Sequence, residues 1–355
     1  MRMKQRLLTV LALTATLLAA HAQQPKGGTS SANLVISKVF YNNMVNDAKK
    51  AFILANFLEL YNNSDQTLDV TGVYIGFCDN TSTTAKDFPY AWTAANMEQE
   101  HKDSIALKQI FRIPTDKQFL LAPGQSIVVC NSALNHTTVA SKAPDLSKAD
   151  FEVKSLLSTY KDNHNDQVPE LPQVFSYNDN STYIQWMSPG PFGVVLLEAD
   201  TDLDNCPTGL YMSPSESTSL YKFVPAAKTI DAADFVEHSA KTGPDASQKR
   251  IPSAYDAGFI ATNCAGGNGG EALVRKVAST ASDGRVILAD TNNSSNDFEV
   301  TTDLSIRSFS QTSGISTVTM DDKANNMWYN LRGQRMMQPT SKGIYIQGSR
   351  KMILR

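Results

Sequence analysis

Short runs in which apolar and polar residues alternate recur along most of the chain. Residues 33–41 are rich in β-branched and aromatic side chains, and residues 57–62 alternate apolar positions with polar ones such as Glu59. A period of two residues places every second side chain on the same face of a strand. Both segments are therefore predicted to be β-strands, and residues 68–78 are predicted to form a third.

Residues typical of turns separate these strands at close intervals. Pro123 and Gly124 lie between the apolar runs 119–121 and 126–130, so this segment predicts a hairpin. Further strands are predicted at 110–113, 182–187 and 193–198. Many short strands joined by Gly, Pro, Asn and Asp favour a mostly-β sandwich.

Helical patterns are few. Residues 147–160 are predicted to hold one helix, and residues 231–238 are predicted to hold another because acidic residues stand near its start. Two short helices do not change the prediction of a mostly-β fold.

Several motifs occur in the order that is typical of a lamin-tail domain. Residues 34–41, 57–65 and 68–75 resemble the opening strands of that family, and residues 121–126 resemble its Pro-Gly hairpin. Residues 272–276 and 290–298 resemble its final signature, although Val73 and Tyr74 stand where the family usually has Trp. The resemblance implies an immunoglobulin-like β-sandwich.

The two halves of this resemblance are far apart in the sequence. They imply a split sandwich over residues 33–310, with a long mixed insertion at about 131–270. Residues 145–152 and 190–196 also resemble a secreted family of unknown function from Bacteroidetes that contains such a split sandwich, so the resemblance spans about 33–305. No activity follows from it, because one fold supports many functions.

The last part of the chain changes in composition. Residues 311–323 are small and polar and predict a linker, and residues 324–355 contain three short strand patterns with Gly turns that predict a small β-module. Residues 329–335 and 342–346 resemble the carboxyl-terminal sorting domain of the type IX secretion system. That resemblance implies export through the outer membrane. The alternative is a terminal β-ribbon packed on the main domain.

The first residues predict a cleaved signal peptide. Three cations precede an apolar run that is too short to span a bilayer, and Ala20 and Ala22 stand at the two small-residue positions that signal peptidase requires. Cleavage is expected after Ala22. Residues 1–22 are then lost, and residues 23–32 form a flexible leader rich in Gly, Ser and Gln. No transmembrane segment is expected in the mature chain, which is predicted to be secreted or on the cell surface, with the periplasm as the alternative.

Charge and cysteine content narrow the picture further. The formal net charge is -3, and such a mildly acidic, mixed surface gives no electrostatic reason to expect nucleic-acid binding. Export permits disulfides, and four cysteines allow three pairings. Their spacing slightly favours Cys78 with Cys130 and Cys206 with Cys264, and buried free thiols are the alternative.

Candidate metal and catalytic residues are sparse. Asp200, Asp202 and Asp204 alternate in a way that could offer oxygen ligands to calcium, although an exposed acidic loop is the simpler interpretation and the spacing does not fit an EF-hand. The histidines that remain after cleavage are well separated and form no zinc motif: His101, His136, His164 and His238. Neither a nucleophile elbow nor a P-loop is present.

Two further features concern the surface. Trp92, Trp186 and Tyr183 are candidates for exposed aromatic residues that contact glycans, but each fits the core equally well. Ser104 lies in an Asp-Ser-Ile sequence that resembles the short O-glycosylation motif of this bacterial group.

These observations predict a non-enzymatic binding protein, secreted or on the cell surface, whose ligand is unknown. Expected partners are an outer-membrane or surface protein, such as an uptake receptor that it assists, or a glycan, and no cofactor is expected apart from the calcium considered above. A secreted hydrolase or metal-dependent enzyme with its site in the 131–270 insertion is the alternative. A structural envelope protein is the third hypothesis. Convergence of His136, His164, His238 and the acidic run in one pocket would favour an enzyme.

Overall fold

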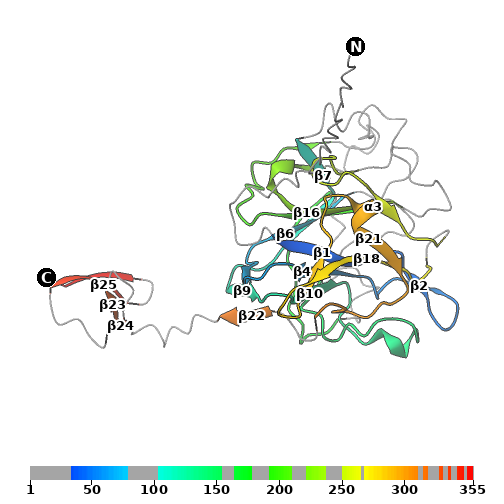
Figure 1. Cartoon of the computed structure of the whole chain (residues 1–355), viewed down its shortest axis with the longest axis horizontal. Coiled ribbons are helices and arrows are strands. Elements are labelled where there is room, and N and C mark those ends of the chain that lie inside the picture. Colours follow the sequence, from blue (N-terminus) through cyan, green and yellow to red (C-terminus); the bar gives the residue numbers. More distant parts are fainter. Residues whose placement is uncertain are drawn as a thin grey trace, which may run out of the picture.

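A computed structural model describes most of the chain between residues 33 and 310 and parts of the carboxyl-terminal segment. The described ranges are 33–78, 103–153, 164–177, 192–209, 221–236, 250–264, 268–310, 315–318, 328–330, 335–336, 342–347 and 350–354. The structure is mostly β, as the alternation predicted, and its strands form two large sheets with smaller ones around them (Figure 1). Neither the signal peptide nor the leader lies within the described residues.

The first large sheet contains the front and the back of the chain side by side. Its six strands have the order β11-β10-β4-β1-β18-β21. Their bounds are Phe151–Glu152, Ser126–Cys130, Phe57–Asn62, Leu34–Phe40, Ala272–Arg275 and Phe298–Thr301. Strand β1 pairs antiparallel with β18, with Val39 opposite Leu273, so residues from both halves of the lamin-tail resemblance share one sheet.

The second large sheet takes most of its strands from the region predicted to be an insertion. Its order is β12-β8-β6-β13-β16-β17. The bounds are Gln173–Ser176, Gln109–Arg112, Tyr74–Phe77, Phe192–Leu197, Thr229–Val236 and Ile260–Ala261. Strand β13 pairs with β6, so residues after 131 complete the sandwich by hydrogen-bonding directly to its front half.

The main core lies between the two sheets and follows the predicted alternation. On β4, Leu58 and Leu60 belong to this core, and on β6, Ile75 and Phe77 face them from the other sheet. Phe298, which follows the polar 290–296 loop, is 2% exposed and belongs to this core.

A second apolar cluster covers the outer face of the first sheet. Phe57 and Val128 pack there against Leu146 and Leu304, which come from the loops after β10 and β21. These loops explain why β4 is buried on both faces despite its alternating sequence. A third cluster, which includes Tyr74 and Val195, covers the outer face of the second sheet.

One predicted helix is a strand. Residues 231–238 were expected to be helical, but residues 231–236 belong to β16, which pairs with β13 over Phe192–Leu197. Asp231 and Asp234 are not helix-start residues: both are buried, and their carboxylates accept hydrogen bonds from backbone N–H groups. Of the helix expected at 147–160, residues 151–152 are strand β11, and residues 154–160 lie outside the described part.

The remaining elements are short. They are β2 Met44–Val45, β3 Ala51–Phe52, β5 Leu68–Asp69, β7 Ser104–Leu107, β9 Gln118–Leu121, β14 Thr208–Gly209, β15 Tyr221–Pro225, β19 Val277–Thr280, β20 Val286–Leu288, the 3₁₀ turns η2 His136–Thr138 and η4 Ala226–Lys228, and the helix α3 Ser294–Asp297. Asn293 caps α3 by accepting a hydrogen bond from the Ser295 N–H, so the 290–296 loop satisfies its own backbone groups.

The described residues of the carboxyl-terminal segment form five more strands. Strand β22, Ile315–Val318, pairs with β9, so this part of the predicted linker is a strand. Strands β23 to β26 form a separate sheet of order β24-β23-β25-β26, with bounds Trp328–Asn330, Arg335–Met336, Gly343–Gln347 and Arg350–Leu354. Trp328 contacts the Tyr345 ring edge-on within this sheet.

Candidate functional site

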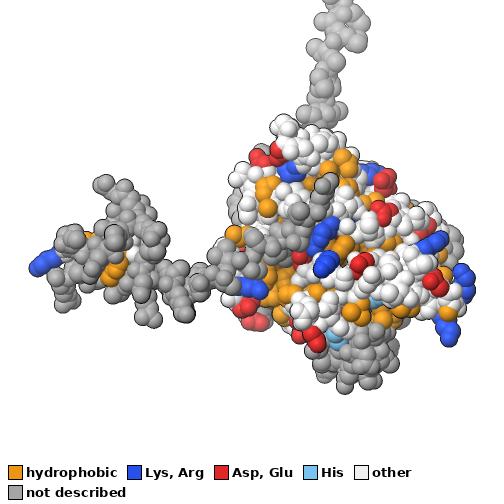
Figure 2. Space-filling view, turned by 90° about the horizontal axis from the view of Figure 1, so that it is seen from below, with side chains coloured by type: hydrophobic (Ala, Val, Ile, Leu, Met, Phe, Trp, Pro, Cys, Tyr) orange, Lys and Arg blue, Asp and Glu red, His pale blue; other side chains and the backbone are white. Residues whose placement is uncertain are grey.

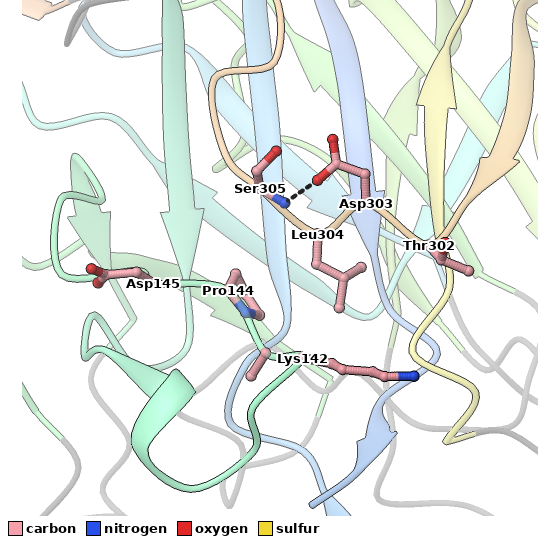
Figure 3. A pocket seen from close by; sticks show the side chains of 8 residues that line it. Lys142, Pro144, Asp145, Thr302, Asp303, Leu304 and Ser305 are labelled. Carbon is pink, nitrogen blue, oxygen red and sulfur yellow. Dashed lines mark hydrogen bonds between the residues drawn. The ribbon is translucent and has the colours of Figure 1, made fainter.

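A cleft of about 470 Å³ lies between two loops on the outer side of the first sheet. We call it the loop cleft; its lining residues are Lys142, Ala143, Pro144, Asp145, Thr302, Asp303, Leu304 and Ser305. Leu304 points toward the segment around Pro144, and Lys142 extends along the opening below Thr302 (Figure 3). The cleft therefore has an apolar floor and a polar rim, which suits a ligand with both kinds of surface.

The loop that forms one wall is held from below by a buried lysine. We call residues 302–310 the strap. The Nζ of Lys38, on β1, donates hydrogen bonds to the carbonyls of Asp303 and Ser305 at 3.2 and 2.8 Å and to the Ser308 Oγ at 2.6 Å. Burial lowers the pKa of Lys38, and the nearby Glu59 and Asp303 carboxylates oppose that shift. Three acceptors around one ammonium fix the backbone that lines the cleft.

A buried carboxylate anchors the other end of the strap. Glu59 lies opposite Lys38 in the β1–β4 pairing, and its oxygens accept hydrogen bonds from the Ser126 Oγ and the Arg307 N–H. Burial raises the pKa of Glu59 against the effect of these bonds. Arg307 has φ +60°, and its guanidinium bonds the Asp150 carboxylate at 2.9 Å. The strap is thus tied to β1, β4 and β10 in one defined conformation.

Among the rim residues of the loop cleft, Lys142 and Asp145 are exposed and their charges have no partner in the described part of the chain. The carboxylates of Asp145 and Asp303 each accept one backbone hydrogen bond, from the Ser147 N–H at 3.0 Å and from the Ser305 N–H at 2.9 Å, and Figure 3 shows the second. The lining of the cleft can therefore offer one cation, two carboxylates and hydroxyl groups, and it contains no cysteine or histidine.

The acidic run predicted as a calcium site does not gather its carboxylates. Asp200 bonds the Lys228 ammonium at 2.9 Å, and Lys228 also bonds Glu198. Asp202 accepts a hydrogen bond from the Asn205 amide, and Asp204 is exposed. Over the residues that the structure describes, no group of three or more His, Cys, Asp or Glu side chains is placed to hold a metal. Asp202 and Asp204 instead line a second, smaller cavity.

Two of the predicted histidines lie within the described part of the chain, and one of them contacts a carboxylate. The Nδ1 of His164 lies 2.7 Å from the Glu152 carboxylate, and its buried Nε2 has no hydrogen-bond partner. His136 is buried, its Nε2 contacts the Ser132 carbonyl at 2.9 Å, and burial lowers its pKa although the charge of Glu152 opposes this. His101 and His238 lie outside the described residues. Among the described residues, no hydrogen bond joins the acidic run to either histidine, and the three do not form a metal-binding group.

All four cysteines are free thiols, and the favoured pairings are not formed. Cys78 follows β6 in the second sheet, whereas Cys130 ends β10 in the first, and the two belong to different apolar clusters. The predicted pairing of Cys78 with Cys130 was wrong because it rested on sequence spacing, which does not show which sheet each strand joins. Burial raises the pKa of the Cys130 thiol, which makes it a core residue instead of a nucleophile.

An ion pair that the sequence did not reveal lies between the two sheets. The Arg275 guanidinium bonds the Asp231 carboxylate at 2.7 Å, and both side chains are buried. Burial raises the pKa of Asp231 to about 7 against the opposing effect of Arg275. Asp231 also accepts from the Ile36 N–H, and the Arg275 Nε–H donates to the Ile36 carbonyl. The ion pair has a structural role, because it supplies hydrogen-bond partners to the N–H and the carbonyl of Ile36 at the point where the β1–β4 register shifts.

The predicted surface residues fall in different places. Ser104 is half-buried at the start of β7, on the edge of a three-stranded sheet. Trp92, Trp186 and Tyr183 lie outside the described residues. Acidic and basic side chains are interspersed on the face seen in Figure 2. None of the described helices is long and apolar enough to cross a membrane.

Comparison with known proteins identifies a family. Residues 122–305, just over half of the chain, match the model of DUF4876, a family of proteins of unknown function. A crystal structure of a DUF4876 family protein from Bacteroides thetaiotaomicron VPI-5482 has a similar fold, with a TM-score of 0.61 and 23% identity over 76% of this chain and 70% of that one. The comparison with curated proteins gives no match. The expectation of a family of unknown function is thereby confirmed: the chain belongs to the DUF4876 family.

Proposed function

We propose that the chain is a non-enzymatic binding protein, secreted or on the cell surface, and that the loop cleft is its ligand site. The observation that carries this proposal is the construction of the cleft. Its walls come from two distant loops, yet Lys38 and Glu59 fix the strap to the sandwich from below. Binding sites are commonly loops that a rigid scaffold holds in place.

The chemistry of the cleft supports binding more than catalysis. Lys142, Asp145 and Thr302 offer a cation, an anion and a hydroxyl at the rim, whereas Leu304 supplies an apolar floor. A nucleophile with an adjacent base would be needed for hydrolysis, and the cleft lining contains no such pair. A polar ligand with an apolar face, such as a sugar chain or a segment of a surface protein, fits this combination.

One observation favours the alternative of a hydrolase. Glu152 orients His164 through Nδ1 and leaves its buried Nε2 without a partner, which resembles the carboxylate–histidine pair of a general base and would need a path for the substrate to reach Nε2. If this pair acts in catalysis, His164→Gln abolishes a hydrolytic activity of the wild-type chain on ester or glycoside substrates. If wild type and variant are equally inactive while both bind ligand, the alternative is excluded.

Export is part of the proposal. It rests on the cationic, apolar and Ala-x-Ala segments of residues 1–22 and on the resemblance of residues 329–335 and 342–346 to a sorting domain. Expression of the full chain in a Bacteroidetes host, followed by fractionation and amino-terminal sequencing, tests it. We expect a product that begins at Gln23 in the surface or secreted fraction. An intact precursor in the cytosol would contradict the proposal.

The binding function is tested with residues 23–355 on an array of oligosaccharides and, separately, on immobilised outer-membrane protein. Thr302→Trp places a bulky side chain at the rim of the loop cleft, and Lys142→Ala removes its free cation. We expect wild type to bind either an oligosaccharide or an outer-membrane protein. Both variants should lose about tenfold in affinity, and for Lys142→Ala this loss corresponds to roughly one charge-assisted contact. Lys117→Ala, outside the cleft, is the control. Equal binding by wild type and both cleft variants would overturn the assignment of the site.

A further inference from the structure

The second cavity, of about 230 Å³, lies at one end of the second large sheet. We call it the sheet-end pocket; its lining residues are Tyr74, Arg112, Val174, Thr201, Asp202, Leu203 and Asp204. Tyr74 begins β6, Arg112 ends β8 directly opposite it, and Val174 comes from the neighbouring β12. The other four residues follow β13, which pairs with β6. Four adjacent strands therefore define the pocket.

Arg112 is held in position but its charge is not used. Its guanidinium carbon lies 4.8 Å from the centre of the Tyr74 ring, and its Nε–H donates to the Gly72 carbonyl at 3.3 Å. Within the described part of the chain, its two terminal nitrogens have neither a hydrogen-bond nor an ion-pair partner. A guanidinium fixed on one side presents a two-pronged donor on the other, which matches a carboxylate.

Opposite charges line the same pocket without neutralising Arg112. Asp202 uses one oxygen for the Asn205 amide at 2.7 Å, and the exposed side chain of Asp204 has no hydrogen-bond or ion-pair partner among the described residues. Neither carboxylate forms an ion pair with Arg112, since no nitrogen of Arg112 lies within 4.0 Å of an oxygen of Asp202 or Asp204. One cation and two anions thus face a small space that is open to solvent.

We propose that the sheet-end pocket binds a small zwitterion, an α-amino acid, with its carboxylate on Arg112 and its ammonium near Asp202 and Asp204. The lining carries one positive and two negative charges, so a ligand that bears only a carboxylate adds to the excess of negative charge. The small volume requires the two charged groups of the ligand to be close together. Val174 and Leu203 supply an apolar wall for its side chain.

The experiment is calorimetric titration of residues 23–355 with L-alanine, propionate and L-alaninamide. Propionate lacks the ammonium and L-alaninamide lacks the carboxylate. We expect L-alanine to bind with one site per chain and both analogues to bind about tenfold more weakly or worse, because each loses one charge-assisted contact. Absence of L-alanine binding, or equal binding of propionate, would overturn the proposal.

Two variants locate the site. Arg112→Gln removes the carboxylate donor and is expected to abolish detectable binding of L-alanine. Because Arg112 also packs on Tyr74, Asp204→Asn is the second variant: the exposed Asp204 side chain makes no hydrogen bond or ion pair with the described residues, so we expect the fold to be kept and the affinity to fall several-fold. Asp116→Asn, an exposed acid outside the pocket, is the matched control. L-alanine affinity that is the same in Asp204→Asn and Asp116→Asn would refute the assignment of the ammonium.

Binding of L-alanine to the sheet-end pocket does not depend on the loop cleft. Lys142→Ala, which impairs the loop cleft, is expected to leave L-alanine binding unchanged, since Lys142 does not line the sheet-end pocket. If Lys142→Ala reduces L-alanine binding as much as Arg112→Gln does, the amino acid occupies the loop cleft and the sheet-end assignment is wrong.

Discussion

Two charged clusters flank strand β1, and they have different structural roles. On the side of the second sheet, Asp231 and Arg275 bond the N–H and the carbonyl of Ile36, where the β1–β4 register shifts. On the other side, Lys38 bonds the strap, whose residues line the loop cleft. The first cluster replaces backbone partners within the closed sandwich, whereas the second shapes a surface.

This difference separates what stabilises the fold from what forms the site. Both clusters are buried, and in both of them burial disfavours the charged form: it lowers the pKa of Lys38 and raises the pKa values of Glu59 and Asp231. Their acceptors differ: Arg275 donates to Ile36, Asp231 and Ala289, on three separate segments of the chain, whereas Lys38 donates to one loop. Loss of the Arg275 cluster should therefore act on global stability, and loss of the Lys38 cluster should act mainly on the strap.

The largest expected effect belongs to Arg275→Met. The change leaves Asp231 buried without its cation and the Ile36 carbonyl without a donor. Removing one partner of a buried ion pair costs about 3–5 kcal/mol in the free energy of unfolding. Urea denaturation followed by circular dichroism measures it. Arg275→Lys should lie between wild type and Met, since Lys cannot reproduce the planar contacts, and Lys148→Met is the surface control. A Met variant as stable as wild type would show that the pair is dispensable.

Lys38→Met should have a smaller and more local effect. The variant keeps the apolar stem but removes the donor to two strap carbonyls and to Ser308. We expect a loss of about 1–3 kcal/mol in the free energy of unfolding, with faster amide hydrogen exchange confined to residues 302–310. Ser308→Ala removes one of the three bonds and should change exchange less. If exchange rises uniformly over the sandwich, the two clusters do not differ as described.

The smallest expected effect is a pH dependence that distinguishes Asp231. Its pKa is about 7 in the folded chain, compared with an ordinary value of 3.8. Between these values the folded state holds a proton that the unfolded state has released, so this group favours folding at low pH, and that contribution is lost as the pH rises from about 4 to about 7. The slope is at most about 1.4 kcal/mol per pH unit.

Asp231→Asn tests that sign. The amide cannot titrate, so the stability of the variant should fall less steeply than that of wild type over the same pH range, even though the variant is weaker throughout. Glu59 and Asp150, whose pKa values burial also raises, remain in both proteins and cancel in the comparison. Parallel thermal melts between pH 4 and pH 8 give the two slopes. Equal slopes would mean that Asp231 remains ionised in the folded chain.

Local sequence predicted the strands well where one face of a strand is apolar. Residues 57–62 and 126–130 are strands β4 and β10, and their alternate apolar residues face the core. Prediction failed within residues 231–238, where the acidic residues near the start indicated a helix and residues 231–236 belong to a strand. Those carboxylates are acceptors for backbone groups of Ile36 and Arg250, which are remote in sequence, so no local pattern reports them.

The same limitation affected the sites. The acidic run was predicted as a calcium site, but Asp200 pairs with Lys228, and Asp202 and Asp204 line a pocket together with Arg112, which stands nearly a hundred residues earlier. The loop cleft combines segments that follow different strands of one sheet. Lys38 looks like an ordinary polar position in an alternating strand, and only the strap that covers it makes it a buried anchor.

The pairing of β1 with β18 also sets an order of events during biogenesis. Ile36 and Arg275, which bond each other, are 239 residues apart, and contacts of such long range make closure of a β-sandwich slow. A growing chain that ends before residue 272 leaves one edge of β1 without its neighbour, and an open strand edge of this kind invites pairing with other chains. Truncations within the 131–270 region should consequently aggregate, and the chain needs protection until its final strands have emerged.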